Sequence, residues 1–138
     1  MPRTPIPDEL ITFLAAPNPS VIATVTPDGE PHSAATWYLW DDGRVLVNMA
    51  ATRKRLDHMR RDPHVSLTVL DKDEWYRQVT LRGRVTEIAA DDALEGIDRL
   101  ARHYTGNAYA RRQDARVNAW IDVGSWYGWY GGAPWMGS

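Results

Sequence analysis

Short strand-like runs separated by tight turns limit the fold of this chain more than any other feature of its sequence. The run over residues 20–26 is rich in Val, Ile and Thr and ends in the turn Thr26-Pro27-Asp28-Gly29. A second turn, Asp41-Asp42-Gly43, separates a long strand expected over residues 30–40 from a third strand expected over residues 44–48. Because connections this short join antiparallel neighbours, the first part of the chain predicts a β-meander.

Further strands are expected in the second half of the chain. Residues 65–71 form one, and residues 75–89 form another in which apolar and polar positions alternate. Residues 117–123 form the last clear strand, and residues 126–130 either continue it or fold back over the surface. The tail over residues 131–138 is expected to be loose.

Helices interrupt this strand pattern in only a few places. Apolar spacing predicts one helix near residues 5–14 and another that opens at Asp91-Asp92 and ends near Gly106, and the Arg-rich segment 111–116 could add one helical turn. The chain of 138 residues is therefore expected to form a single, mainly β, mostly antiparallel domain over residues 1–138. Periodicity alone does not separate a barrel from a sandwich.

A basic stretch follows the third strand. Thr52 is the expected N-cap of a short helix that ends near Arg61, and the next three residues are Arg53, Lys54 and Arg55. A helix N-terminus is electropositive, so its first turn normally favours Asp or Glu rather than three cations. An anion such as a phosphate would stabilise this arrangement, since N–H groups, a hydroxyl and cations would converge on it. On these residues alone, a solvated helix with an unfavourable first turn fits equally well.

Several other kinds of chemistry find no support in the sequence. The chain has no Cys, its four His lack metal-site spacing, and no metal is expected. It lacks a nucleophile-elbow motif, a Walker loop and a dinucleotide-binding glycine fingerprint. A net charge of −2 gives no reason to expect a nucleic-acid partner. No segment is long and apolar enough to span a membrane and no export signal is visible, so a cytoplasmic location is expected.

The remaining hypothesis is the binding of a flat, anionic molecule. The seven Trp against one Phe suit ring-binding clefts, although ordinary core packing is an alternative. A bound cofactor would then supply the reactive chemistry, while the protein would orient it and exclude water.

The order and spacing of several short motifs carry a family resemblance. The motifs are Thr26-Pro27-Asp28-Gly29-Glu30-Pro31-His32, Thr36-Trp37-Tyr38-Leu39-Trp40-Asp41-Asp42-Gly43, Thr52-Arg53-Lys54, Arg61-Asp62-Pro63-His64-Val65, Tyr76-Arg77, Leu81-Arg82-Gly83-Arg84-Val85 and Tyr104-Thr105-Gly106. Over about residues 8–130 the chain resembles the pyridoxamine-phosphate-oxidase-like superfamily of flavin- and deazaflavin-binding proteins. More narrowly, it is similar to the F420-dependent oxidoreductase branch, which is common in actinobacteria. The resemblance implies an FMN-binding-like split β-barrel and a homodimer with cofactor clefts at the subunit interface.

The same resemblance implies a set of cofactor-binding residues. Thr52, Arg53 and Lys54 occupy the positions of the family's phosphate motif, in agreement with the helix-start argument. The other implied contacts lie on the neighbouring strands and one later turn: Val47, Asn48, Met49, Ser33, Ala35, Trp37 and Arg77. Arg77 is the weakest of these, as a contact for an acidic cofactor tail. No catalytic residue is implied.

One departure from the family narrows the expected activity. His32 and Trp37 stand where the FMN-dependent pyridoxamine-phosphate oxidases carry a basic pair, so pyridoxal phosphate synthesis is not expected. The expected activity is hydride transfer from reduced F420 to a small, electron-poor substrate such as one with an activated C=C bond. The alternatives are an FMN-dependent oxidoreductase, a non-catalytic carrier of flavin, deazaflavin or haem, and a dimeric barrel whose aromatic C-terminal segment only forms an interface.

Overall fold

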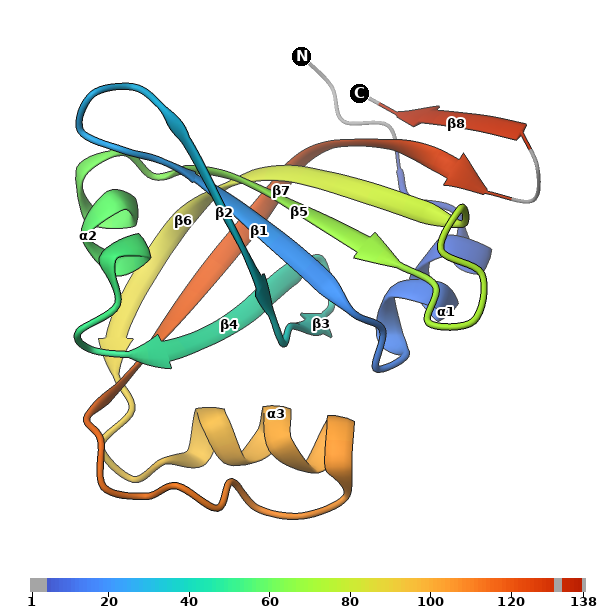
Figure 1. Cartoon of the computed structure of the whole chain (residues 1–138). Helices are drawn as coiled ribbons and strands as arrows, with labels where there is room; N and C mark the ends of the chain where they lie inside the picture. The colour runs from blue at the N-terminus through green and yellow to red at the C-terminus, as the bar shows by residue number, and fades with distance from the viewer. Residues whose placement is uncertain (1–4, 131–132, 138) are drawn as a thin grey trace.

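The computed structural model describes residues 5–130 and 133–137 of the chain, with side chains described for residues 5–129 (Figure 1). In this part of the chain the helices are α1 (Asp8–Ala15), α2 (Lys54–Arg61) and α3 (Glu95–Thr105). The strands are β1 (Ser20–Val25), β2 (Pro31–Thr36), β3 (Leu39–Asp41), β4 (Arg44–Ala50), β5 (His64–Leu70), β6 (Gln78–Ala90), β7 (Arg116–Tyr130) and β8 (Ala133–Gly137).

All of these strands belong to one antiparallel sheet. Its order is β2-β1-β5-β6-β7-β4-β3, with β8 paired to β7 outside this path. The long central strands β6 and β7 shift register between Arg82 and Gly83 and again between Val85 and Glu87. Such irregularities increase the local twist and bend of a strand pair.

The connection between β2 and β3 explains why the sheet rolls up. These two strands are the opposite edges of the path β2-β1-β5-β6-β7-β4-β3, yet only Trp37 and Tyr38 separate them in the chain. The sheet must therefore curl until its two edges approach each other, while the edges remain unpaired (Figure 1). This is a split barrel, and it confirms the expected mainly β, mostly antiparallel class.

The barrel interior forms the main hydrophobic core, and α1 and α2 close it. Leu10 and Leu14 of α1 and Leu56 and Met59 of α2 are buried in the same cluster as the inward residues of the strands. A smaller cluster lies on the outer side of β4, where Leu46 packs with residues of α3. β4 is thus covered on both sides, which explains why five consecutive residues of this strand are buried.

The expected single strand over residues 30–40 is wrong in one respect, because the chain passes from one sheet edge to the other in its middle. Tyr38 is fully buried at this crossing, and its hydroxyl donates to the carbonyl of Leu14 at 2.7 Å. Trp37 stacks on Tyr104, with ring centroids 5.3 Å apart. The sequence gives no sign of this break, because strand-forming residues continue through it. The residues before it pair regularly with β1, and those after it pair regularly with β4.

Three other differences concern the second half of the chain. Residues 111–115 adopt no helical turn. β7 continues to Tyr130, the first of the two alternatives for residues 126–130. The expected loose tail is wrong for residues 133–137, which pair with β7 as β8, and the rest of it lies outside the described residues.

None of the helices in the described part of the chain has both the length and the apolar character that crossing a membrane would require.

Candidate functional site

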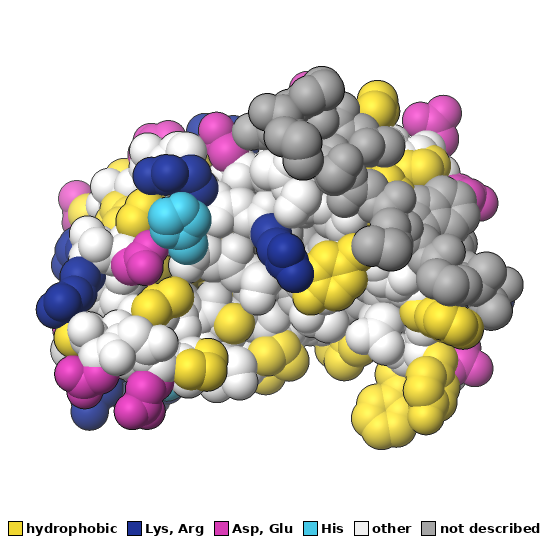
Figure 2. Space-filling view, turned by 90° about the horizontal axis from the view of Figure 1, so that it is seen from above, with side chains coloured by type: hydrophobic (Ala, Val, Ile, Leu, Met, Phe, Trp, Pro, Cys, Tyr) yellow, Lys and Arg dark blue, Asp and Glu magenta, His cyan; other side chains and the backbone are white. Residues whose placement is uncertain are grey.

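A cleft of about 550 Å³ lies beside the start of α2. We call it the α2 cleft, and its lining residues are His32, Ala34, Ala50, Thr52, Arg53, Lys54, Arg55, Arg111 and Asp114. These residues come from β2, the end of β4, the start of α2 and the segment before β7. Figure 2 shows Lys and Arg side chains at the end of the molecule where α2 lies, and hydrophobic side chains projecting from the opposite end.

Backbone hydrogen bonds at the end of β4 fix the position where the helix starts. The N–H of Ala51 donates to the carbonyl of Ala115, and the N–H of Arg53 donates to the carbonyl of Ala50 at 3.0 Å. This turn places Thr52 before the helix and Arg53 at the capping position, where no side chain caps the N–H groups. Thr52 as the N-cap is therefore wrong by one residue, although cations do occupy the first helical positions, Lys54 and Arg55.

The α2 cleft carries more positive than negative charge. Arg111 is neutralised by Asp114, with 2.8 Å between its Nε and the carboxylate. Arg53 and Lys54 form no ion pair with any residue that the structure describes. Such a concentration of cations attracts an anion, and a phosphate would satisfy several of them together.

Two residues that line the α2 cleft each have a buried side-chain nitrogen atom without a hydrogen-bond partner among the described residues. These atoms are Nε of Arg55 and Nδ1 of His32. Buried polar atoms are normally paired, because leaving one unpaired costs about 1–3 kcal/mol. Burial lowers the pKa of Arg55, and the neighbouring charges of Arg53 and Arg116 lower it further. A ligand with anionic oxygen atoms would accept hydrogen bonds from these residues and would stabilise the positive charge of Arg55. These residues therefore fit an anionic group.

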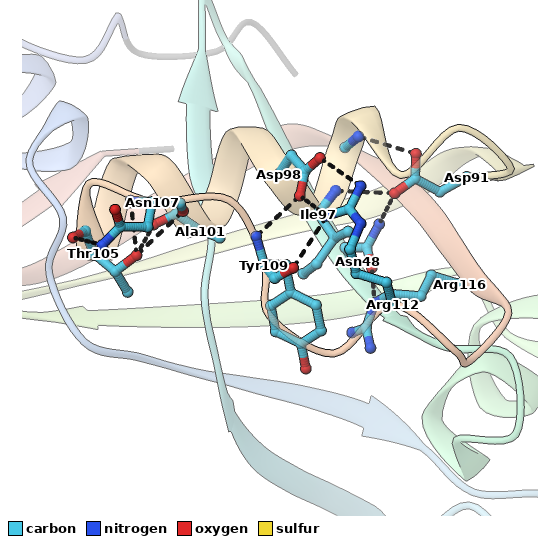
Figure 3. A network of polar contacts seen from close by, with 11 residues as sticks. Asn48, Asp91, Ile97, Asp98, Ala101, Thr105, Asn107, Tyr109, Arg112 and Arg116 are labelled. Carbon is cyan, nitrogen blue, oxygen red and sulfur yellow. Dashed lines mark hydrogen bonds and ion pairs between the residues drawn. The ribbon is translucent and has the colours of Figure 1, made fainter.

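A second cavity, of about 220 Å³, adjoins the α2 cleft and shares Arg55 with it. We call it the α3 cavity, and its lining residues are Thr36, Trp37, Asn48, Arg55, Ile97, Leu100, Tyr109 and Arg116. A polar network behind it connects α3 with β4 and β7 (Figure 3). In this network Asn48 donates to Asp91 and to Asn118 and accepts from Nε of Arg116 at 2.8 Å.

The structure distributes the expected contacts on β4 between two environments. Asn48 is among the residues that line the α3 cavity. Val47 and Met49 are buried in the main core, with 0% and 1% of their surface exposed. The structure does not bring these two side chains to the α2 cleft, and their contact with a cofactor stays a prediction.

The expected contacts on β2, Ser33 and Ala35, share one face of this strand. His32 and Ala34 line the α2 cleft, whereas Ser33 and Ala35 are exposed on the other face of this edge strand. Trp37 reaches the α3 cavity. Ser33 and Ala35 stay predictions.

Arg77 lies far from the other expected contacts within one chain. It ends the hairpin that joins β5 to β6, and this hairpin is at the opposite end of β5 from α2 (Figure 1). The same hairpin carries Trp75 and Tyr76, the most exposed large hydrophobic side chains that the structure describes. Arg77 stays a prediction for a cofactor tail.

Several residues of these two cavities were not among the expected contacts, including Arg55, Arg111, Tyr109 and Arg116. Arg55 was recognised only as part of the basic helix start. The Arg-rich segment 111–116 was visible in the sequence, but nothing there indicated that it would lie beside a helix 60 residues earlier in the chain. His32 was noted only as a departure from the family pattern.

The fold defines the class of protein: a split barrel of the flavin-binding, oxidoreductase-like type. The chain matches the pyridoxamine 5'-phosphate oxidase family over residues 6–130 and belongs to that family.

Solved structures agree with this family membership. An F420 reductase is similar with a TM-score of 0.81 and 27% identity, over 88% of this chain and 98% of that one. A conserved hypothetical protein from Mycobacterium tuberculosis has a TM-score of 0.72 and 24% identity, over 97% of this chain and 86% of that one. General stress protein 26 from Bacillus anthracis has a TM-score of 0.66 and 21% identity, over 86% and 90%. The last two similarities concern the fold alone.

Proposed function

We propose that this protein is an F420-dependent reductase whose α2 cleft holds the phosphate-bearing part of the cofactor. The observation that carries the proposal is the pair of cations Arg53 and Lys54, which line the α2 cleft beside the uncapped start of α2 and form no ion pair with any described residue. The similarity to an F420 reductase, which extends over 98% of that chain, supports the choice of cofactor.

The residues at the start of α2 have specific roles in this proposal. Arg53 and Lys54 would donate charge-assisted hydrogen bonds to phosphate oxygens, and the hydroxyl of Thr52 would add a neutral donor. The first N–H groups of α2, which no side chain caps, would donate to the same anion. Reduced F420, when bound, supplies a hydride.

The contribution of the chain is to position the reactants and exclude water. Trp37 stacks against Tyr104 and lies between the α3 cavity and a second hollow at the edge of β2. Holding two reactants in a productive geometry can supply a large part of a rate enhancement without a covalent intermediate.

The hydroxyl groups of the buried Tyr38 and the partly buried Tyr104 both donate structural hydrogen bonds. The hydroxyl of Tyr38 donates to the carbonyl of Leu14, and that of Tyr104 donates to the carbonyl of Asn18 at 2.6 Å. Burial raises the pKa of Tyr104 to about 12 and that of Tyr38 further. We assign neither of them as a proton donor.

The proposed substrate is a small, electron-poor organic molecule with an activated C=C bond. A homodimer with the cofactor cleft at the subunit interface also belongs to the proposal, and the exposed Ser33 and Ala35 on the edge strand β2 are suited to such an interface. A cytoplasmic location remains a prediction.

The second candidate is an FMN-dependent oxidoreductase, because the α2 cleft would accept the phosphate of either cofactor. The test is a fluorescence titration of the purified protein with F420 and FMN side by side. We expect clearly tighter binding of F420, followed by oxidation of reduced F420 in a screen of electron-poor alkenes. Tighter binding of FMN would replace the proposal with the second candidate, and binding without any turnover in the screen would favour a carrier.

A further inference from the structure

The lining of the α3 cavity combines two chemically different kinds of residue. Ile97, Leu100, Trp37 and Tyr109 are apolar or aromatic. Arg55, Arg116 and Asn48 are polar or charged. Ligand sites commonly combine an apolar lining with a few converging polar groups that fix the orientation of the ligand. This cavity is suited to a flat molecule that carries one anionic group.

Arg116 differs from the other arginines of its segment in having no acidic partner. Arg111 pairs with Asp114, and Arg112 pairs with Asp98, with 2.8 Å between its Nη1 and the carboxylate. Arg116 instead donates through Nε to the neutral amide of Asn48 and lies 4.8 Å from the centre of the Tyr109 ring. Within residues 5–129, no carboxylate lies within ion-pair distance of its guanidinium group.

The one carboxylate connected to Arg116 is already used by other donors. Asp91 accepts from the N–H groups of Gly96 and Ile97 at the start of α3, at 3.0 and 2.9 Å, and from the amide of Asn48 at 3.0 Å. It is buried and reaches Arg116 only through Asn48 (Figure 3). The network therefore orients Arg116 without neutralising its charge.

Arg55 adds a second unneutralised cation to the same cavity. Its only hydrogen bond to a described residue is a long one, 3.4 Å from Nη2 to the hydroxyl of Thr36, and its Nε has no partner there. Burial lowers the pKa of Arg55, and the nearby charges of Arg53 and Arg116 lower it further. Two guanidinium groups that face one partly apolar cavity repel each other unless an anion lies between them, and guanidinium groups bind carboxylates with a well-defined geometry.

We propose that Arg55 and Arg116 form a subsite for the carboxylate of the substrate, which is then a small, flat acid whose body packs against Trp37 and Tyr109. The proposal rests on the proposed function, since it names the substrate class of the same reductase. The same oxyanion chemistry could come from an acidic group of the cofactor, and the test distinguishes these two sources.

The test is an NMR titration of the full-length protein without cofactor at fixed ionic strength, with benzoate as the probe and benzamide as its neutral counterpart. The variant Arg116→Gln removes the charge and keeps an N–H donor for Asn48. The control Arg60→Gln removes an exposed cation of α2 that lines neither cavity. We expect Arg116→Gln to weaken benzoate binding at least about tenfold, the effect of losing a hydrogen bond to a charged group. We expect Arg60→Gln to leave it unchanged, and benzamide to bind weakly to all proteins.

The test also uses a second variant, Arg55→Gln, and a second ligand, F420. Arg55→Gln should weaken benzoate binding in the same way, which keeps the test valid if Arg116→Gln fails to fold. The affinity of Arg116→Gln for F420 should match that of the wild type. A loss of F420 affinity with unchanged benzoate affinity would assign the anion to the cofactor and overturn the proposal.

Equal binding of benzoate to the wild type and to both variants would also overturn the subsite, as would equal binding of benzoate and benzamide. If the wild type binds benzoate through Arg116 but does not bind F420, the proposed cofactor is wrong while the carboxylate subsite is supported. The two proposals therefore fail on different measurements.

Discussion

At the scale of single residues, the sequence predicted which side chains bring positive charge to the site better than it predicted where those side chains lie. The cations at positions 53–55 predicted an anion-binding helix start, and the structure places all three in the α2 cleft. The cap residue was wrong by one position, because a backbone turn, rather than the hydroxyl of Thr52, sets where the helix begins. Arg116 was not predicted because its role depends on Asn48, which is 68 positions away in the chain.

Asp98 gives a pH-dependent prediction at this scale. Hydrogen bonds from Arg112 and from the N–H of Tyr109 hold the pKa of Asp98 below its ordinary value of 3.8. A carboxyl group that is more acidic in the folded state stabilises the fold above its unfolded pKa, and this contribution is lost as the pH falls through the folded pKa. We therefore expect Asp98→Asn to lower Tm at neutral pH, and the difference from the wild type to shrink below pH 3.8.

Thermal melts of the two proteins from about pH 7 down to about pH 2 measure this difference. Asp92→Asn is the matched control, because this neighbouring acid is exposed and should give no comparable pH-dependent difference. A difference for Asp98→Asn that stays constant over the whole range would show that the pair with Arg112 does not stabilise the fold through its charge.

At the scale of secondary-structure elements, the predictions were correct for features that depend on adjacent residues. They were wrong for features that depend on which strands pair with each other. The turns after β1 and β3 were predicted correctly, because each depends on a few adjacent residues. The predicted alternation of β6 holds from Leu81 to Thr86, whereas Thr80, expected on the polar side, is buried. The break at Trp37 and Tyr38 and the strand β8 were not predicted, since both depend on partners elsewhere in the sheet. Asp91 was expected at the start of α3, and it does accept hydrogen bonds from that helix, although the helix itself begins at Glu95.

The register shift between β6 and β7 gives a prediction at this scale. A Cβ atom on Gly83 would overlap the backbone carbonyl of Asp122 in the neighbouring strand and would lie 2.9 Å from Cγ2 of Ile121. Backbone cannot move aside as a side chain can, so we expect Gly83→Ala to destabilise the fold by about 1–3 kcal/mol. Urea denaturation measures the change, and Gly124→Ala in β7 is the control, since its Cβ would make only an ordinary contact at 3.6 Å. Equal stability of the two variants would contradict the close packing of β6 on β7.

At the scale of the whole molecule, the fold followed from the sequence more completely than the site did. Short turns and alternating strands predicted an antiparallel sheet, and the family resemblance specified a split barrel, which the structure confirms. The site is assembled from β2, β4, α2, α3 and the segment before β7, and their convergence depends on how the sheet curls. A sequence pattern can indicate each of these pieces but not the distances between them.

The measurement that tests the central claim most directly is the F420 affinity of Lys54→Ala, determined by fluorescence titration. Lys72→Ala is the matched control, because Lys72 is the only other lysine in the chain and is exposed in the hairpin between β5 and β6. The α2 cleft as the phosphate site predicts at least about tenfold weaker binding for Lys54→Ala, with an unchanged Tm and wild-type affinity for Lys72→Ala. Unchanged F420 affinity in a correctly folded Lys54→Ala protein would contradict the assignment of the cofactor to this cleft.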